Sequence, residues 1–176
     1  MDETIRTFLS PKIFYNKLLK CNIDFFTGVP DSLLKDICQY ITDNTPKEKH
    51  IIAANEGNSV GIAAGYYLAT NKIPLVYLQN SGFGNIINPL TSLIDEQVYN
   101  IPILILVGWR GEPGKKDEPQ HKSMGKIQEK LLDTLGIKYE ILPDYDDGAI
   151  ELIEKAYRYM IETKKPFVFL VKKQTF

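Results

Sequence analysis

The chain has 176 residues, of which 44% are hydrophobic and 24% are charged, with 21 basic residues against 22 acidic ones. This composition is typical of one globular domain, and a formal charge of -1 argues against a nucleic-acid-binding protein. No apolar run approaches the roughly 20 residues that span a bilayer, and the acidic start, Met1–Glu3, does not fit a signal peptide. We therefore expect a cytoplasmic protein that binds neither nucleic acid nor a membrane.

The order of apolar segments predicts the fold class. A helix is expected first, with Ser10 as its N-cap and Pro11 at its first position. Six short apolar runs then have the character of buried parallel strands. They cover residues 23–27, 50–54, 74–79, 102–107, 138–142 and 167–171. Between them, apolar residues recur three and four positions apart, so the sequence predicts an α/β domain with a six-stranded parallel sheet and helices on both faces.

The cysteines and histidines are too few for a zinc site. Cys21 and Cys38 lie in helical patterns without a C-x-x-C spacing, and we expect both to be reduced thiols in the core. Only His50 and His121 are available besides them, so we expect no metal bound by this chain.

Ligands of open parallel sheets bind beyond the carboxyl ends of the strands, so the loops at those ends are the candidate sites. The first loop, Gly28–Ser32, opens a helix whose free N–H groups suit an anion. The alternative interpretation is a plain turn in which Asp31 or Ser32 caps the helix.

The helix after the second strand begins near Glu56 and contains Gly57, Gly61 and Gly65. Glycine costs a helix about 1 kcal/mol relative to alanine, so three of them indicate close approach to the sheet or to a partner helix. The alternative interpretation of Glu56 is a structural one: a glutamate in the first turn of a helix interacts favourably with the helix dipole.

The third loop, Gln79–Asn85, resembles a dinucleotide-binding motif only loosely. Gly82 and Gly84 form G-x-G, but Ile87 occupies the position of the next required glycine. We expect instead a polar turn that brings backbone close to a flat or charged ligand, with Phe83 offering a ring face.

The fourth loop, Gly108–Lys122, is the longest irregular stretch and is typical of a lid or a binding loop. Its net excess of one positive charge is too small to indicate an anionic ligand. His121 is suited to proton transfer near neutral pH, and a solvent-exposed histidine is the alternative.

Taken together, these loops resemble the pyrimidine-binding domain of thiamine-diphosphate-dependent 2-oxo-acid decarboxylases over nearly the whole chain. The motifs that carry the resemblance are Gly28-Val29-Pro30-Asp31-Ser32, Asn55-Glu56-x-Asn58 with Ala63-Ala64-Gly65-Tyr66, Ser81-Gly82-Phe83-Gly84-Asn85, Ile101–Gly108 and Gln120-His121. Each motif is loose alone, but five in the same order on one side of a sheet are specific. Within the family, residues 80–93 and 110–121 are most similar to the decarboxylases of phosphonopyruvate and sulfopyruvate.

The resemblance implies that Glu56 is the pivotal catalytic residue beside the aminopyrimidine of thiamine diphosphate. A carboxylic acid that shares a proton with a ring nitrogen favours the imino form of the exocyclic amine, which can then deprotonate the thiazolium carbon. Burial must outweigh the helix N-terminus for Glu56 to keep that proton at neutral pH. The resemblance further implies proton transfer by Asp31, Ser32 and His121, and cofactor contacts by Val29, Pro30, Gly82, Phe83 and Asn85.

Family members bind the diphosphate through Mg2+ in a second domain that carries Gly-Asp-Gly followed by an asparagine. This chain has no Gly-Asp-Gly, and Asp146-Asp147-Gly148 cannot replace it because no asparagine follows Asn100. We therefore expect residues 1–176 to form the pyrimidine-binding domain alone. The diphosphate-binding half would then be a further domain or a β subunit, and the active enzyme a homo- or hetero-oligomer.

The expected activity is that of a carboxy-lyase on a small anionic 2-oxo acid. Phosphonopyruvate, giving phosphonoacetaldehyde and carbon dioxide, is the first substrate expected, and sulfopyruvate is the alternative. A hypothesis from another class is a non-catalytic doubly wound module that binds a small anion or a partner protein and uses the same loops as ordinary caps and turns.

Overall fold

Helices and strands alternate along the chain in the computed structural model, which describes residues 8–176. The start of the chain, including Met1–Glu3, lies outside the described residues. The elements are α1 (Pro11–Lys20), β1 (Phe26–Gly28), η1 (Ser32–Leu34), α2 (Lys35–Asn44), η2 (Lys47–Lys49), β2 (His50–Ile52), α3 (Glu56–Thr70), β3 (Leu75–Gln79), η3 (Asn80–Gly82), α4 (Phe83–Ser92), β4 (Leu104–Gly108), α5 (Pro119–Thr134), β5 (Lys138–Ile141), α6 (Asp146–Thr163) and β6 (Phe167–Val171). The η elements are single turns of 3-10 helix.

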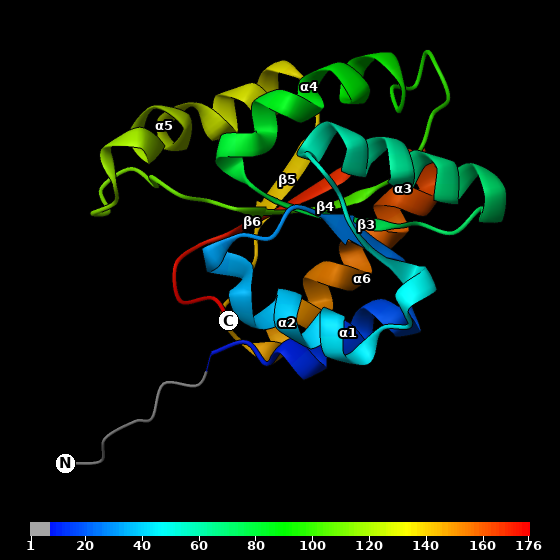
Figure 1. Ribbon diagram of the computed structural model, residues 1–176, viewed down its shortest axis with the longest axis horizontal. Coiled ribbons are helices and arrows are strands. Elements are labelled where there is room, and N and C mark those ends of the chain that lie inside the picture. Colours follow the sequence, from blue (N-terminus) through cyan, green and yellow to red (C-terminus); the bar gives the residue numbers. More distant parts are fainter. Residues whose placement is uncertain (1–7) are drawn as a thin grey trace.

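The strands form one sheet in the order β2-β1-β3-β4-β6-β5, and every neighbouring pair is parallel. Helices α3, α4 and α5 cover one face, and α1, α2 and α6 cover the other (Figure 1). The predicted fold class is therefore confirmed. Because all strands run in the same direction, the four loops singled out in the sequence meet at one edge of the sheet.

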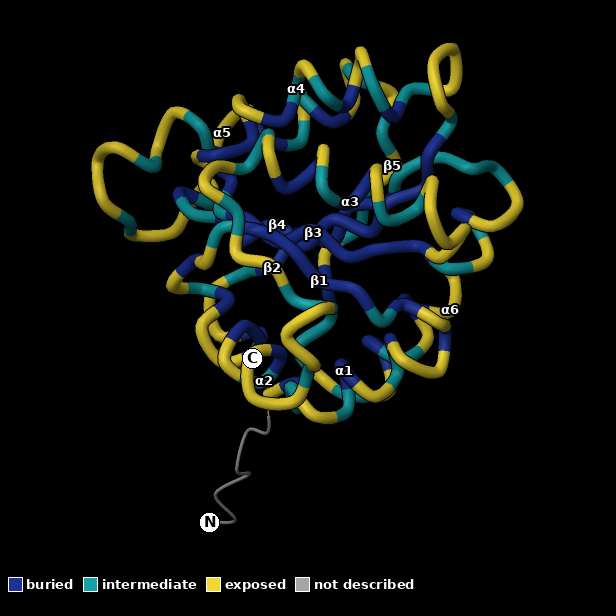
Figure 2. Tube along the Cα trace, turned by 45° about the vertical axis from the view of Figure 1, so that its right-hand side comes forward, coloured by how far each residue is buried: buried dark blue, intermediate teal, exposed yellow. Residues whose placement is uncertain are grey.

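The core has two layers because successive side chains of a strand point to opposite faces. In β4, Leu104 and Leu106 pack under α1, α2 and α6, whereas Ile105 and Val107 pack under α3, α4 and α5. Strands β4 and β6 are buried along their full length, as the dark blue centre of Figure 2 shows for the middle of the sheet. The central strands thus give the loops at their carboxyl ends a rigid base.

Strands β2 and β5 lie at the two edges and are only partly buried. The prediction of a buried strand over 50–54 is wrong in this respect, because β2 ends at Ile52 and has a neighbour on one side only. Ile51 is 39% exposed and Ile52 is 60% exposed. The opposite edge strand, β5, begins with the exposed residue Lys138.

Local signals near the N-terminus are confirmed. The Ser10 hydroxyl accepts a hydrogen bond from the Ile13 N–H at 3.4 Å, and Pro11 opens α1. Cys21 and Cys38 are free and buried. Between residues 8 and 176, no helix is both long and apolar enough to cross a membrane.

Candidate functional site

Glu56 is the first residue of α3, at the carboxyl end of the sheet. The helix begins there because the Asn55 side chain accepts a hydrogen bond from the Asn58 N–H at 2.9 Å. The Glu56 side chain is bound by Asn85, whose Nδ2 donates to Oε2 at 2.7 Å. Glu56 is half-buried, so one side of the carboxylate remains open to a ligand.

Gly82 makes room for this carboxylate, and Gly57 lets α3 approach α4 closely. A Cβ at Gly82 would overlap the carboxyl group of Glu56, and a Cβ at Gly57 would come within 2.8 Å of the Asn85 carbonyl oxygen. The expectation of close approach is therefore confirmed at Gly57. At Gly61 and Gly65 no other part of the described chain approaches the helix closely, because both glycines face open space.

Asp31 and Ser32 differ in how they are held. The Asp31 side chain is 6% exposed and accepts hydrogen bonds from the Leu33 N–H at 2.9 Å and from Gln79 Nε2 at 2.6 Å. It caps η1, as the alternative interpretation of this loop predicted. Ser32 is exposed, and its hydroxyl accepts a hydrogen bond from Arg110 Nη1 at 2.8 Å.

The loop between β4 and α5 is organised around the carboxylate of Asp117. Arg110 donates to it through Nε at 2.9 Å and through Nη2 at 2.6 Å, and His121 Nδ1 lies 3.0 Å from it. The hydrogen bonds from Arg110 are the largest cause that lowers the pKa of Asp117 far below its usual range. In turn, Asp117 raises the pKa of Arg110. His121 is thus tied to a carboxylate and is not freely exposed.

Asn80 joins this loop to the turn beside Glu56. Its Nδ2 donates to the Arg110 carbonyl at 2.8 Å, and its Oδ1 accepts from the Arg110 N–H at 3.1 Å. Asn80 is 1% exposed, and only one residue separates it from Gly82. Asn80 therefore links the two ends of the site, Glu56 and His121, through contacts within the chain.

The residues expected to contact the cofactor differ in how far they are exposed. Phe83 does not offer a ring face, because its side chain is fully buried in the core under α3, α4 and α5. That part of the prediction is wrong, and its spacing to Ile86 and Leu90 on the buried side of α4 explains why. Val29 is half-buried and Pro30 is exposed at the rim of the same edge.

Sequence reasoning missed Gln79, Asn80, Arg110 and Asp117 as parts of the site. Asp117 carried one available signal, because it is a carboxylate only four residues before His121 in the loop that leads into α5. Gln79 and Asn80 carried no comparable signal, because their partners are distant in the sequence.

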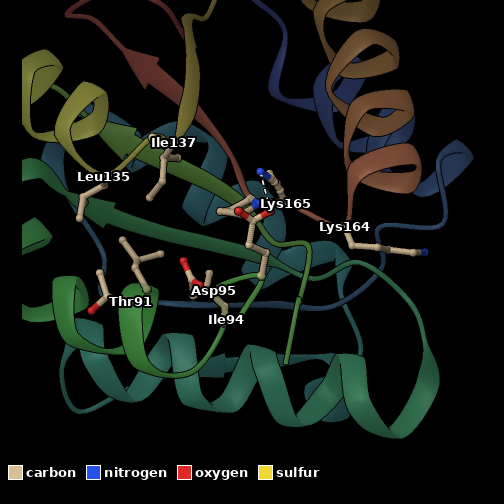
Figure 3. Close-up of a pocket in the computed structure, with 11 residues that line it drawn as sticks. Thr91, Ile94, Asp95, Leu135, Ile137, Lys164 and Lys165 are labelled. Atoms are coloured by element: carbon tan, nitrogen blue, oxygen red, sulfur yellow. Dashed lines mark ion pairs between the residues drawn. The ribbon is translucent and has the colours of Figure 1, made fainter. Parts of the chain in front are cut away.

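A cavity lies at the amino-end edge of the sheet, near the ends of α4, α5 and α6 (Figure 3). Its lining includes the apolar side chains of Ile94, Leu135 and Ile137. Lys165 Nζ forms an ion pair with Glu96 Oε2 at 2.7 Å there, and Lys164 points away. This cavity contains none of the residues predicted for the site.

The carboxyl-end edge therefore presents a half-open carboxylate, an amide donor beside it and an imidazole held by a second carboxylate. This set suits recognition of a flat nitrogen heterocycle and proton transfer at a nearby atom. In the described part of the chain, no group of three or more metal-binding side chains comes together.

Comparisons with known proteins point to one family. The model of the family described as "Thiamine pyrophosphate enzyme, N-terminal TPP binding domain" matches residues 12–135. Phosphonopyruvate decarboxylase from Streptomyces viridochromogenes is 34% identical over 144 residues, which are 82% of this chain and 35% of that protein. Sulfopyruvate decarboxylase subunit alpha from Methanococcus maripaludis is 37% identical over 157 residues, which are 89% of this chain and 90% of that one.

The chain therefore spans about a third of the first relative and most of the second. Among solved structures, benzoylformate decarboxylase from Polynucleobacter necessarius matches with a TM-score of 0.70 and 20% identity. The match covers 96% of this chain and 30% of that one. At this level of identity the structural likeness supports the fold.

Proposed function

The chain belongs to the family of thiamine pyrophosphate enzymes, as an N-terminal TPP-binding domain, and we propose that it is the pyrimidine-binding half of a decarboxylase. The reaction proposed is cleavage of carbon dioxide from a small 2-oxo acid that carries a second acid group. Phosphonopyruvate, which would give phosphonoacetaldehyde, is the first candidate, and sulfopyruvate is the second. The names of the two relatives support both acids.

Glu56 is the catalytic residue in this proposal. Its contact with Asn85 beside the bare backbone of Gly82 is the observation that carries the proposal. The absence of a side chain at Gly82 lets the Glu56 carboxyl group lie against the backbone, and a carboxyl group held there fits an aminopyrimidine with a ring nitrogen facing Glu56. Thiamine diphosphate, when bound, supplies the carbon nucleophile and accepts the electrons released with carbon dioxide. Glu56 holds the proton at the ring nitrogen, and Asn85 orients the carboxyl group.

Ser32, His121 and Asp31 complete the proposed proton-transfer set. Ser32 and His121 lie on either side of Arg110 and Asp117, which hold both in place. Asp31 would act from a fixed position, since both of its carboxylate oxygens already accept hydrogen bonds. Val29 and Pro30 would border the cofactor at the rim of the first loop.

The other half of the cofactor site would come from a diphosphate-binding domain or a β subunit, together with Mg2+. The half-burial of Glu56 supports this, because desolvation of its carboxyl group would be completed by cofactor and partner. The outer surface of α3 supports it as well. Gly61 and Gly65 face open space there, and Leu68 is 58% exposed, so a partner helix can approach closely.

The test is Glu56→Gln in the protein assembled with its diphosphate-binding half, compared with Glu151→Gln, an exposed residue of α6. We expect Glu56→Gln to lower turnover of phosphonopyruvate or sulfopyruvate by about 10²–10⁴-fold, because glutamine cannot transfer the proton. The melting temperature should stay close to that of the parent, and Glu151→Gln should leave both quantities unchanged.

Near-normal turnover in Glu56→Gln would refute the catalytic role of Glu56. No turnover of any of the acids by the parent assembly would support the non-catalytic binding module. Substrate choice is read from the same assay run with phosphonopyruvate, sulfopyruvate and pyruvate. Equal turnover of all three would contradict recognition of a second acid group.

A further inference from the structure

We propose that Asp117 is a positioning residue that holds His121 in the Nδ1–H form and so leaves Nε2 free to accept a proton in the site. The inference rests on the proposed function, in which His121 transfers protons. It adds a residue that the motifs of the family resemblance did not include. Asp117 acts through His121 and is not itself proposed to touch substrate.

The Asp117 carboxylate can only accept hydrogen bonds, because its pKa is lowered far below the usual range, chiefly by the hydrogen bonds from Arg110. His121 Nδ1 lies 3.0 Å from Asp117 Oδ1. An ionised carboxylate at that distance requires a proton on Nδ1. In a neutral imidazole, the other ring nitrogen, Nε2, then carries the lone pair.

The direction of the carboxylate is fixed from several sides. Besides His121, its oxygens accept from Arg110 Nε and Nη2, from the Gly111 N–H at 2.8 Å and from the Glu118 N–H at 2.8 Å. Two different loop segments and one side chain thus hold Asp117 in a single orientation. The carboxylate has no freedom to turn away from the imidazole without losing charged hydrogen bonds.

The imidazole is fixed as well. Side chains of Asp117 and His121 are 14% and 13% exposed, and the four-residue spacing places them together at the start of α5. Gly111 has a φ of +69°, and a Cβ there would overlap the His121 carbonyl, so the loop backbone lies directly on this turn. Within residues 8–176, no hydrogen-bond partner is found for Nε2. That nitrogen therefore keeps its capacity to accept a hydrogen bond from a ligand.

The contact with Asp117 decides which nitrogen of His121 can accept a proton. Which ring nitrogen of a histidine accepts a proton is set by the hydrogen bond that the other nitrogen makes. With Nδ1–H bound to Asp117, a proton taken from a group in the site goes to Nε2 and can return from there. Without Asp117, both tautomers become accessible, and Nε2 carries a hydrogen for part of the time.

The experiment is ¹⁵N NMR of the imidazole nitrogens in the full 176-residue chain, at pH 9, well above the ordinary imidazole pKa of about 6.5. The chain has only two histidines, and His50, whose Nε2 lies 2.8 Å from the Tyr77 hydroxyl, reports independently on the fold. In the parent we expect a protonated Nδ1 and an unprotonated Nε2 at His121. In Asp117→Asn we expect a mixture of tautomers, with the His50 signals unchanged. Glu118→Gln, an exposed neighbour, should keep the parent pattern.

A protonated Nε2 at His121 in the parent would overturn the proposal, and so would an unchanged His121 pattern in Asp117→Asn. If the His50 signals shift in Asp117→Asn, the substitution has disturbed the fold, and the proposal is then judged only on the His121 tautomer of the parent. This readout is independent of turnover. A failure of Glu56→Gln to lower activity would remove the proposed function and leave the tautomer result standing, whereas a wrong tautomer would remove only the role of Asp117.

Discussion

The candidate site at the carboxyl ends of the strands and the cavity of Figure 3 at their amino ends hold their charged residues in different ways. At the carboxyl ends, Glu56, Asp31 and Asp117 each accept hydrogen bonds from defined donors, and Asp31 and Asp117 are largely buried. At the amino ends, the cavity of Figure 3 has one ion pair, Lys165 with Glu96, whose side chains are 40% and 53% exposed. The charges of the site are oriented by several donors, whereas the ion pair at the cavity is well exposed to solvent.

This difference teaches where the fold can perform chemistry. A hydrated ion pair is free to move and contributes little in any one direction. A carboxylate held by several donors keeps its direction, which acid-base chemistry requires. Substitutions at the carboxyl ends should therefore change activity strongly, whereas substitutions at the amino ends should not.

After Glu56→Gln, the largest effect is expected from Gly82→Ala, with Gly84→Ala as its matched control two residues away. A methyl group at Gly82 would overlap the Glu56 carboxylate, whereas Gly84 faces open space. We expect Gly82→Ala to lower turnover of the assembled enzyme by about 10²-fold, because the carboxylate is displaced. The free energy of unfolding should fall by about 1–3 kcal/mol.

Gly84→Ala should leave turnover unchanged and slightly raise stability, because alanine favours a helix. Both variants are compared with the parent by their turnover in the assembled enzyme and by their free energy of unfolding in urea. Equal losses in the two glycine variants would show that space beside Glu56 is not what Gly82 provides.

A smaller effect is expected from Arg110→Gln, which removes the main partner of Asp117. At pH 7 we expect a loss of about 1–3 kcal/mol in the free energy of unfolding, since charged hydrogen bonds are lost. Because the folded pKa of Asp117 is lowered, its stabilising contribution is fully present above the ordinary aspartate pKa of about 3.9 and is lost progressively as pH falls from there toward the lower folded pKa. The difference between parent and variant should therefore shrink below about pH 4.

Urea unfolding at several pH values between 7 and 3 measures this convergence. Arg158→Gln, on the exposed side of α6, serves as the control and should run parallel to the parent at every pH. A constant difference between parent and Arg110→Gln down to pH 3 would contradict the coupling of Arg110 to Asp117.

The smallest effect is expected at the amino ends. Lys165→Gln breaks the ion pair with Glu96, and both side chains are well exposed. We expect unchanged turnover and a small fall in melting temperature that disappears in about 1 M salt, where surface charges are screened. A clear loss of turnover would overturn the contrast between the two ends of the sheet.

Much of the fold was predictable because its signals are local. Strand β6 has the predicted bounds, and Ser10 caps α1 as expected. Strand β1 begins at Phe26 and not at Ile23, because it pairs with His50 and Leu75, and strand pairing depends on neighbours distant in the sequence. The exposure of β2 likewise follows from its place in the strand order, which apolar patterning does not encode.

Some residues of the candidate site could be proposed from the sequence, but their contacts could not. Glu56 and His121 stand out by position and type, whereas the meeting of Glu56 with Asn85 depends on how α3 packs against α4. Phe83 was misassigned because its place in a glycine-rich turn outweighed its helical spacing to Ile86. Asp117 was overlooked among other charges of its loop, although its five donors make it the most heavily bonded carboxylate of the site.

The uncovered edge at β2 has a consequence for producing the protein. Its free N–H and C=O groups and the exposed side chains of Ile51 and Ile52 form a template on which another extended chain can add. A newly synthesised chain therefore runs a risk of aggregation that grows with its concentration. Lys138 lowers that risk at the opposite edge, so expression trials should direct solubilising substitutions to the isoleucine edge first.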